Sequence, residues 1–294
     1  MRIGVVTPVL DSRGWVAGTV ASIVGQGAVA RGDVELIYIV QDGGSSDGTV
    51  ERAHAAIDAH APAHAQVIVE SEKDSGMYDA LARGFARIDD LGGADWYTYL
   101  NAGDLWSPTC LSVLARVDDE PRIDWLMGLH TYYSPDNTIV HTRLPFRYRR
   151  NLLRQGVYGR GLPTVQQEST FWRSSIHNRA DLQRLPGFKV AGDTYLWWSF
   201  AQTSEPFIIE ANLGGFRYHG GHLGVDRSVY QGEVTDIAGE LSVKTRAQIP
   251  AERALWEQPA RIKERLNPHL LRFDTSTHAW RNSRTGIAIN ASIP

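Results

Sequence analysis

The sequence feature that most constrains the fold is an alternation of short apolar runs and helix-like segments over residues 1–104. Four apolar runs are typical of buried strands: RIGVVTPVL (2–10), VELIYIV (34–40), AQVIVE (65–70) and WYTYLN (96–101). Helices are predicted between them, over 15–24, 50–60 and 78–88. Continuous apolar strands separated by such helices favour a parallel sheet that is covered on both faces. The pattern therefore predicts an α/β fold with a Rossmann-like, mostly parallel central sheet flanked by helices.

Polar or glycine-rich residues follow each of these predicted strands. They are Thr7 with Pro8, the run QDGGSSDGT at 41–49, residues 70–74, and NAGD at 101–104. In open parallel sheets, ligands bind at the carboxyl ends of the strands. We therefore expect the four clusters to converge on one edge of the sheet and to form a binding site there.

Composition excludes several other classes of protein. The formal net charge of −3 over 294 residues gives no general attraction for nucleic acid or an anionic membrane, so no nucleic-acid partner is expected. The single cysteine, Cys110, cannot form an intramolecular disulfide and fits a reducing compartment. No apolar stretch approaches the roughly 20 residues of a membrane helix, and Asp11 interrupts the N-terminal run too early for a signal peptide. We expect a cytoplasmic protein, with peripheral contact at the inner face of the membrane left open.

The run QDGGSSDGT leaves one carboxylate without a structural task. Gly43 and Gly44 permit backbone conformations that are closed to other residues, and Asp47 is placed to cap the next helix. Asp42 remains, and it can accept hydrogen bonds from a pyrimidine N–H or a ribose hydroxyl. The alternative is a turn carboxylate that is satisfied by local amides.

The next two clusters contain candidates for phosphate and cation binding. In SEKDSGMYDALARG, Lys73 offers a positive charge to a diphosphate, whereas Asp79 lies in the first turn of a helix, where an acid is favourable in any protein. In LNAGDLWSP, Asp104 follows a strand, and Gly103 lets a ligand approach the backbone. Such a carboxylate suits Mg²⁺ or Mn²⁺, which often take only one or two ligands from the protein. The alternative is a helix N-cap, for which Ser107 is better placed.

The alternating pattern ends after residue 104. A pair of strands is predicted at 124–133 and 137–144, followed by a basic, glycine-containing loop at 148–163. A helix is predicted around DTYLWWSFA, and further helices over 225–263. The tail, 274–294, is polar and contains one short predicted strand, GIAIN.

Six segments, taken in order, resemble the motifs of family 2 glycosyltransferases, which have the glycosyltransferase A fold and use nucleotide sugars. The segments are VVTPVLD, QDGGSSDGT, SEKDSGMYDALARG, LNAGD, QESTFWR and VAGDTYLWWSF. The resemblance runs from about Arg2 to about Leu223 and does not cover the rest of the chain. It implies a catalytic domain over 1–224, with a nucleotide-binding half at 1–104 and an acceptor-binding half at 105–224. Residues 225–294 are then a helical C-terminal extension, through which a homo-oligomer could form.

The resemblance also implies roles for residues of the first half. Asp42 would contact the pyrimidine, Thr7 and Pro8 would line the base pocket, and Lys73 would lie near the nucleotide. Asp79 and Gly103 are included with these donor-binding candidates. Asp104 would ligate a Mn²⁺ or Mg²⁺ cofactor. The sequence departs from the family here, because Asn101 and Gly103 stand where acids are often found.

Glycosyl transfer also needs a base for the acceptor hydroxyl and a surface for the sugar rings. Asp193 in VAGDTYLWW matches the catalytic aspartate of the family, and its alternative role is a helix N-cap. Glu168 in QQEST is the second candidate for the base. Trp197 and Trp198 follow Asp193 by about one helical turn and are candidates for acceptor binding, although core packing explains either tryptophan alone.

The segment YHGGHLG contains His219 and His222, which are candidates for further metal ligands. The alternative is a plain glycine-rich turn. The basic residues within 147–154 suit an anionic or lipid-linked saccharide acceptor, and a solvated loop explains them equally well.

The sequence thus predicts a metal-dependent transferase that moves a sugar from a nucleoside diphosphate donor to an acceptor hydroxyl. The family resemblance implies that the donor is UDP-linked and that the reaction inverts the anomeric carbon. Polysaccharide or glycoconjugate biosynthesis is the expected setting. The alternative is a non-catalytic protein with the same fold that binds nucleotide sugars or carbohydrate. The small number of acids in the motif NAGD favours this alternative. A nucleotidyltransferase is less consistent with TPVLDSRG, which lacks the expected density of glycine.

Overall fold

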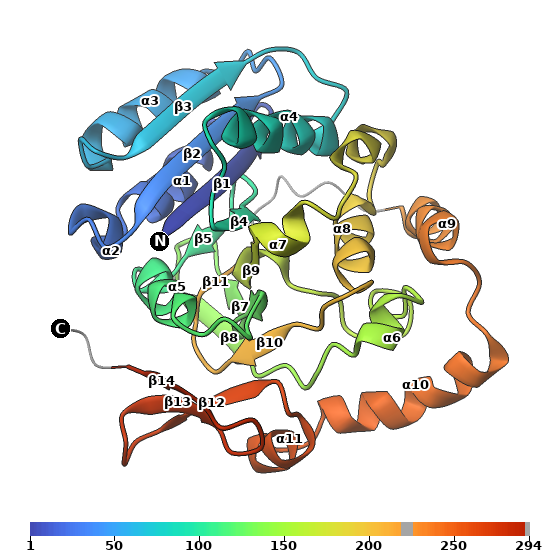
Figure 1. Ribbon diagram of the computed structural model, residues 1–294. Helices are drawn as coiled ribbons and strands as arrows, with labels where there is room; N and C mark the ends of the chain where they lie inside the picture. The colour runs from blue at the N-terminus through green and yellow to red at the C-terminus, as the bar shows by residue number, and fades with distance from the viewer. Residues whose placement is uncertain (219–225, 292–294) are drawn as a thin grey trace.

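The computed structural model describes residues 1–218 and 226–291, and a ten-stranded sheet forms its centre (Figure 1). The strand order is β14-β13-β12-β10-β6-β9-β4-β1-β2-β3. The strands are β1 (Arg2–Val9), β2 (Glu35–Asp42), β3 (Gln66–Ser71), β4 (Trp96–Tyr99), β6 (Trp125–Met127), β9 (Thr170–Arg173), β10 (Phe207–Ile209), β12 (Leu270–Asp274), β13 (Ala279–Asn282) and β14 (Ile287–Asn290).

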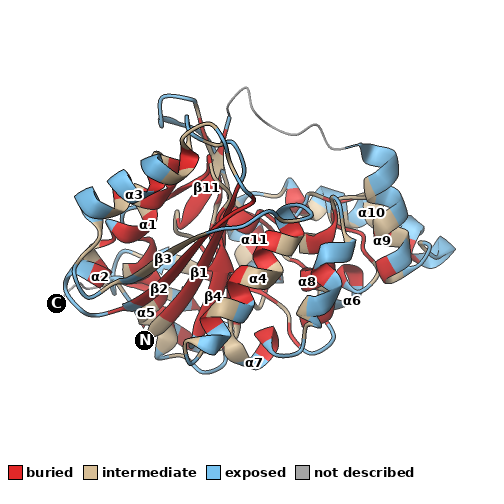
Figure 2. Cartoon of the chain, turned by 90° about the horizontal axis from the view of Figure 1, so that it is seen from above, coloured by how far each residue is buried: buried red, intermediate tan, exposed pale blue. Residues whose placement is uncertain are grey.

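The four N-terminal strands pair in parallel, as the alternating pattern predicts. Helices cover both faces of this part of the sheet (Figure 2). One face carries α1 (Val16–Val24), α2 (Gly27–Ala30), α3 (Thr49–His60) and α5 (Cys110–Asp118), and the other carries α4 (Met77–Asp90), α7 (Ser174–His177) and α8 (Gly192–Phe200). Successive strand residues point to opposite faces, so Val5 and Val6 join different hydrophobic clusters. Burial on both sides explains why these strands are continuously apolar.

A second, four-stranded sheet has the order β5-β11-β7-β8. Its strands are β5 (Leu105–Trp106), β7 (His130–Tyr133), β8 (Ile139–Arg143) and β11 (Gly214–Arg217). The stretch 124–133, predicted as one strand, divides between the two sheets at Gly128, because β6 belongs to the large sheet and β7 to the small one. A Cβ atom at Gly128 would lie 2.8 Å from the carbonyl oxygen of Ala211, so the crossing requires glycine.

The stretch 148–163, predicted as a loop, contains a short helix and part of the core. Helix α6 (Arg150–Leu153) lies here, and Tyr148 and Leu152 are buried. Two 3₁₀ helices follow, η1 (Gln167–Ser169) and η2 (Leu182–Gly187). The basic residues on the surface of this segment therefore stand on an ordered, apolar base.

The C-terminal segment begins with the predicted helices and ends in strands. The helices are α9 (Arg227–Ala238), α10 (Val243–Trp256) and α11 (Ala260–Leu266). The predicted strand GIAIN is β14, but β12 and β13 were not predicted, and β12 pairs in parallel with β10 (Figure 1). The extension is thus helical only as far as α11. Among the described residues, no helix combines the length and apolar character needed to cross a membrane.

Candidate active site

The carboxyl ends of β1, β2, β3 and β4 lie together and bring the predicted polar clusters to one edge of the sheet. Val9 at the end of β1 is in register with Asp42, which is in register with Ser71. The backbone N–H of Leu100 donates to the carbonyl oxygen of Val6, so residues 101–104 begin at the same edge. This convergence follows from parallel pairing, because all four strands end in the same direction.

Asp42 is fully buried, and its carboxylate is occupied by its own loop and by Ser71 at the end of β3. Oδ2 accepts hydrogen bonds from the backbone N–H groups of Gly44 (3.1 Å) and Ser45 (3.0 Å) and from the hydroxyl of Ser71 (2.6 Å). Oδ1 accepts from the hydroxyl of Ser45 at 2.5 Å. This arrangement matches the turn alternative, in which the carboxylate organises the glycine-rich loop. Contact between Asp42 and a nucleotide stays a prediction.

The side chain of Thr7 points into the core. Its Oγ1 accepts a hydrogen bond from the hydroxyl of Tyr38 at 2.9 Å, and both residues are fully buried. Thr7 lies on the same side of β1 as Val5 and Val9, which belong to the cluster under α1. Pro8 is also buried. A base pocket at this point would therefore be lined by the β1 backbone and not by the threonine hydroxyl.

Lys73 and Asp79, both predicted to bind the donor, differ in how free their side chains are. Lys73 is exposed, and no described residue pairs with its ammonium group. Asp79 accepts hydrogen bonds from the N–H and hydroxyl of Ser75 and a two-point contact from Arg83 (3.1 and 3.0 Å). Partial burial opposes ionisation of Asp79, but these contacts hold its pKa below the ordinary value. Asp79 is therefore engaged in joining the loop to α4, whereas Lys73 is free to meet a ligand.

Asp104 is almost completely buried and lies against Arg217 from β11. Its Oδ1 accepts the backbone N–H of Arg217 at 3.0 Å, and the Arg217 guanidinium donates through Nε to the carbonyl oxygen of Gly103 at 2.5 Å. Gly103 has φ +119°, which disfavours other residues, and its N–H donates to Thr19 Oγ1 at 2.9 Å. No described residue donates to Oδ2 of Asp104. Sequence reasoning missed Arg217, although a charged residue inside the strand GGFR was a detectable signal.

Asp104, Glu168 and Asp193 all lie near enough to the buried Tyr99 for their charges to oppose ionisation of its hydroxyl. Burial, followed by the charges of Asp193, Tyr78, Glu168 and Asp104, raises the pKa of Tyr99. Burial and then the charge of Glu168 raise the pKa of Asp104 well above its ordinary value, against the opposing effect of Arg217. The tertiary structure thus brings together three acids from three distant motifs.

Glu168 and Asp193 also have raised pKa values. Burial, with a contribution from the charge of Asp193, raises the pKa of Glu168 to about 7. Burial raises the pKa of Asp193 to about 6, although hydrogen bonds from Thr194 and Tyr78 favour its ionised form. Glu168 is 7% exposed, whereas Asp193 is only partly buried. Perturbed acids of this kind are characteristic of catalytic sites.

Asp193 lies in the first turn of α8 and not at its N-cap position. Ala191 occupies the N-cap, and the helix begins at Gly192. The Asp193 Oδ1 accepts only from the adjacent Thr194, whose N–H is 2.6 Å away. Gly192 allows the close approach of Tyr78, because a Cβ atom there would overlap the phenol ring. Asp193 is therefore not the N-cap residue of α8, which was the alternative interpretation of this aspartate.

The two adjacent tryptophans occupy different environments. Trp197 is 4% exposed and packs against Trp125 and Trp172, with ring centroids 5.7 Å away in both pairs. It leaves no ring face for a sugar, so its expected role in acceptor binding is not supported. Trp198 is partly exposed and lines a cavity of about 440 Å³ between α6, α8 and α9. The other lining residues are Asn151, Arg154, Gln155, Gln202, Ile237 and Ala238.

The candidate metal ligands His219 and His222 lie outside the described residues. Within 1–218 and 226–291, no group of three or more histidine, cysteine, aspartate or glutamate side chains is arranged to hold a metal ion. Asp104 is thus the candidate ligand that the structure places at this edge.

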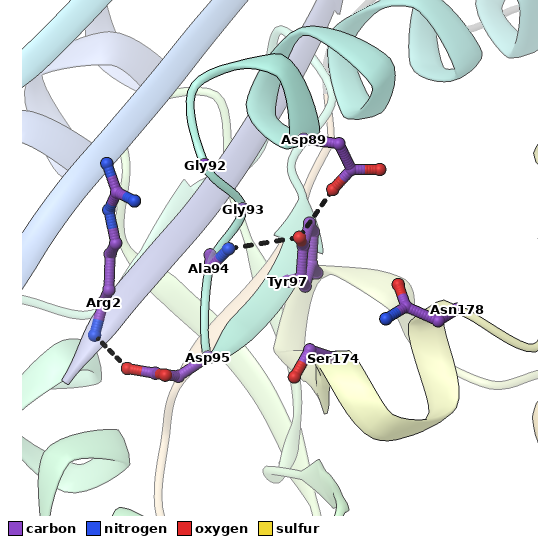
Figure 3. A pocket seen from close by; sticks show the side chains of 9 residues that line it. All are labelled: Arg2, Asp89, Gly92, Gly93, Ala94, Asp95, Tyr97, Ser174 and Asn178. Atoms are coloured by element: carbon purple, nitrogen blue, oxygen red, sulfur yellow. Dashed lines mark hydrogen bonds between the residues drawn. The ribbon is translucent and has the colours of Figure 1, made fainter.

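A different cavity, of about 500 Å³, lies at the opposite edge of the sheet (Figure 3). Arg2 at the start of β1 and Tyr97 in β4 line it, and the Tyr97 hydroxyl donates to Asp89 at 2.7 Å. The amino ends of the strands meet here, so this cavity is separate from the predicted donor-binding clusters.

Comparison with known proteins identifies the class of protein that this fold and site define. The family model described as "Glycosyl transferase family 2" matches residues 4–179, which is more than half of the chain. The chain belongs to this family and is a family 2 glycosyltransferase. The resemblance noted from the motifs is confirmed. No curated protein matches the sequence significantly.

Solved structures of S. aureus TarS have a similar fold. TarS 1–349 in complex with UDP superimposes with a TM-score of 0.58 at 12% identity, over 86% of this chain and 71% of that one. The complex of TarS 1–349 with UDP-GlcNAc gives 0.59 at 13% identity, over 86% and 72%. A longer TarS structure gives 0.58 at 13% identity, and the match spans 43% of its length. These similarities confirm the glycosyltransferase A fold.

Proposed function

We propose that this enzyme transfers one sugar from a UDP-linked donor to an acceptor hydroxyl, with inversion at the anomeric carbon. The observation that carries the proposal is that three acids, Asp104, Glu168 and Asp193, lie near enough to act on the buried Tyr99. Asp104, one of the three, belongs to the segment that begins at the edge where the carboxyl ends of β1, β2, β3 and β4 lie together. The TarS complexes with UDP and UDP-GlcNAc, which share the fold, support a UDP-linked donor.

Asp193 is the proposed base. In a single displacement, the acceptor oxygen bonds to the anomeric carbon, the bond to the diphosphate breaks, and the acceptor proton passes to the base. With a pKa of about 6, Asp193 is mostly ionised at neutral pH and still basic enough to accept this proton. Glu168 is nearly inaccessible and, with a pKa of about 7, is about half protonated at neutral pH, so it remains the second candidate.

Asp104 is the proposed protein ligand for a divalent cation, which family 2 glycosyltransferases commonly use. Its Oδ2, which no described residue occupies, fits one coordination position, and Mg²⁺ or Mn²⁺ can take the remaining ligands from water and phosphate. Such a cation would stabilise the charge of the departing diphosphate. Arg217 keeps Asp104 in place through its backbone N–H and adds a positive charge beside the site.

The remaining donor contacts are proposed from position. Lys73, in the loop after β3, has an ammonium group that pairs with none of the residues in 1–218 and 226–291, and a diphosphate would lie there. The β1 backbone at Thr7 and Pro8, the loop organised by Asp42, and Gly103 would surround the nucleotide. Asp79 would act indirectly, because its carboxylate holds Ser75 and Arg83. This assigns donor binding to the half of the catalytic domain over 1–104.

We assign acceptor binding to residues 105–224, and the acceptor is a saccharide or lipid-linked saccharide of polysaccharide or glycoconjugate synthesis. Trp198 offers a partly exposed indole in the same cavity as Arg154, whose exposed guanidinium pairs with no described residue. Aromatic rings pack on sugar rings, and arginine recognises phosphate.

Calorimetry with UDP tests the donor and metal assignments together. UDP should bind more tightly with Mn²⁺ than with excess chelator, and Asp104→Ala should abolish this difference while leaving some affinity. Equal affinity under both conditions would exclude the metal role of Asp104. A screen of nucleotide sugars by thermal shift would then identify the donor, because a ligand that binds only the folded state stabilises it. Transfer of radiolabelled sugar from that donor distinguishes an enzyme from a protein that binds without turnover.

A further inference from the structure

A single glutamate of the C-terminal extension binds the loop that leads into α8. The carboxylate of Glu233, in α9, accepts hydrogen bonds from three successive backbone N–H groups. Oε1 accepts from Lys189 at 2.7 Å, and Oε2 accepts from Val190 at 3.1 Å and Ala191 at 2.8 Å. Three converging amides satisfy both oxygens of one carboxylate, and bonds to an ionised acceptor are the stronger kind.

The bound loop ends two residues before the proposed base. Ala191 is the N-cap residue of α8, and its side chain makes no capping hydrogen bond. The position of Asp193 therefore depends on how residues 189–191 enter the helix. Glu233 binds the N–H of Ala191, two residues before Asp193, so the two acids lie close in space. In agreement, burial and then the charges of Asp193 and Glu233 raise the pKa of Tyr78.

A second contact from the same helix reaches the other side of Asp193. The hydroxyl of Tyr230 lies 3.1 Å from Oγ1 of Thr194, and the N–H of Thr194 donates to Asp193. Tyr230 is closely packed, because a Cβ atom at Gly159 would overlap its hydroxyl. Helix α9 thus contacts the chain before and after Asp193.

We propose that Glu233 is a positioning residue, which holds the 189–191 loop and thereby orients the Asp193 carboxylate for proton transfer. The role rests on the proposed function, because it assumes that Asp193 is the base. Glu233 lies beyond the stretch matched by the family model, which ends at residue 179. Through Glu233, the C-terminal extension would set the position of the proposed base without contacting the reacting atoms.

The test compares Glu233→Gln with Asp236→Asn. Both changes replace a carboxylate of α9 by an amide, but Asp236 is exposed, and no hydrogen bond or ion pair joins it to the described residues of the loop. The glutamine keeps the size of the side chain and presents an NH₂ group to at least one N–H donor, so at least one of the three hydrogen bonds is lost. A displacement of about 1 Å at a reacting group can reduce the rate by roughly 10²-fold.

Two measurements are made on both variants. Hydrogen–deuterium exchange over 189–194 should accelerate in Glu233→Gln and stay at the wild-type rate in Asp236→Asn. With the donor found by thermal shift, kcat should fall by roughly tenfold or more in Glu233→Gln while the donor KM stays within about twofold, because orientation and not donor binding is impaired. Asp236→Asn should match the wild type in both.

The inference is overturned if Glu233→Gln retains the wild-type kcat. It is also overturned if hydrogen–deuterium exchange rises uniformly over the chain and kcat falls only as far as the fraction of folded protein falls. Asp193→Asn separates this failure from failure of the proposed function. If Asp193→Asn leaves transfer intact, the base is wrong. If Asp193→Asn abolishes transfer and Glu233→Gln does not reduce it, only the positioning role is wrong.

Discussion

Asp193 and Glu168 are acids in surroundings that favour their neutral forms. Burial removes water from both carboxyl groups, and the charge of Asp193 further opposes ionisation of Glu168. An isolated aspartate is ionised at neutral pH but is a weak base, so a raised pKa improves its ability to accept a proton. The same environment means that an ionised Asp193 destabilises the folded protein. At Asp193, stability and activity are therefore expected to oppose each other.

The pH dependence of transfer follows from the pKa of Asp193. Since the base must be ionised, kcat should be constant above pH 7 and fall about tenfold per pH unit below the pKa of about 6. A pH–rate profile with the identified donor measures this acid limb. A midpoint near 7 would instead favour Glu168, whose pKa is about 7.

Asp193→Asn separates a catalytic role from a structural one. Asparagine can still accept the N–H of Thr194 but cannot act as a base, so transfer should fall by roughly 10²-fold or more while UDP binding survives. Glu168→Gln is the matched variant. If it abolishes transfer while Asp193→Asn does not, Glu168 is the base.

The same substitution should stabilise the protein at neutral pH. The folded pKa of Asp193 is raised, so its contribution to stability is fully present below about pH 4 and is lost as the pH rises through about 6. Asp193→Asn removes this loss, and we expect the free energy of unfolding to rise by about 1–2 kcal/mol at pH 7.5 and to change little at pH 4. Urea unfolding at both pH values measures this. A loss of stability at pH 7.5 would show that the carboxylate is needed for the structure of α8.

At the scale of the element, different faces of α8 contact the acid group, the aromatic core and a cavity. Its first turn presents Asp193 to the acid group, and Trp197 packs into the aromatic core beside Trp125. Trp198 points to the cavity between α6 and α9. A helix that is apolar on most of its surface is held on several sides, which suits an element that must keep a base in place.

The adjacent tryptophans of α8 give a matched pair. Trp197→Ala should lower the free energy of unfolding by about 3–5 kcal/mol, because it leaves a cavity in the core. Trp198→Ala should cost less than half as much and should raise the KM for the acceptor. Unfolding curves and acceptor kinetics of both variants test the pair. An unchanged acceptor KM in Trp198→Ala would exclude the cavity at α6 and α9 as an acceptor site.

At the scale of the whole molecule, the two ends of the chain build one sheet. β12 continues the sheet beyond β10, and Leu270 in β12 belongs to the same core cluster as Val6 in β1. Ile287 in β14 joins the cluster on the other face. The C-terminal strands therefore share both hydrophobic cores of the catalytic domain, which predicts that 225–294 and 1–224 unfold together.

Leu270→Ala tests this coupling. The side chain is fully buried, so its truncation should cost about 2–5 kcal/mol and move a single unfolding transition of the entire protein. Val243→Ala is the control, because Val243 lies in the same extension but is 85% exposed. Calorimetry that resolved two transitions, of which only one moved, would show that the extension is a separate folding unit.

Much of the fold was predictable from local pattern. The N-terminal strands are buried on both faces, so their apolar runs carry a strong signal, and parallel pairing places their polar ends at one edge. By contrast, β12 and β13 at the end of the chain are short and partly polar, because fewer of their residues are buried. Gly128 divides one apparent strand between two sheets, which no local pattern records.

The sequence by itself determined the fold class, the edge of the sheet that carries the site, and the motifs from which the acids come. Only the tertiary structure decided which side chains are available. It showed that Asp42 is occupied by its own loop and that Trp197 is buried. It also brought Arg217 to Asp104 and Glu233 to the loop before Asp193. The reason is physical: strand and helix periodicity is local, whereas hydrogen-bond partners, burial and charge depend on residues that are distant in the chain and adjacent only after folding.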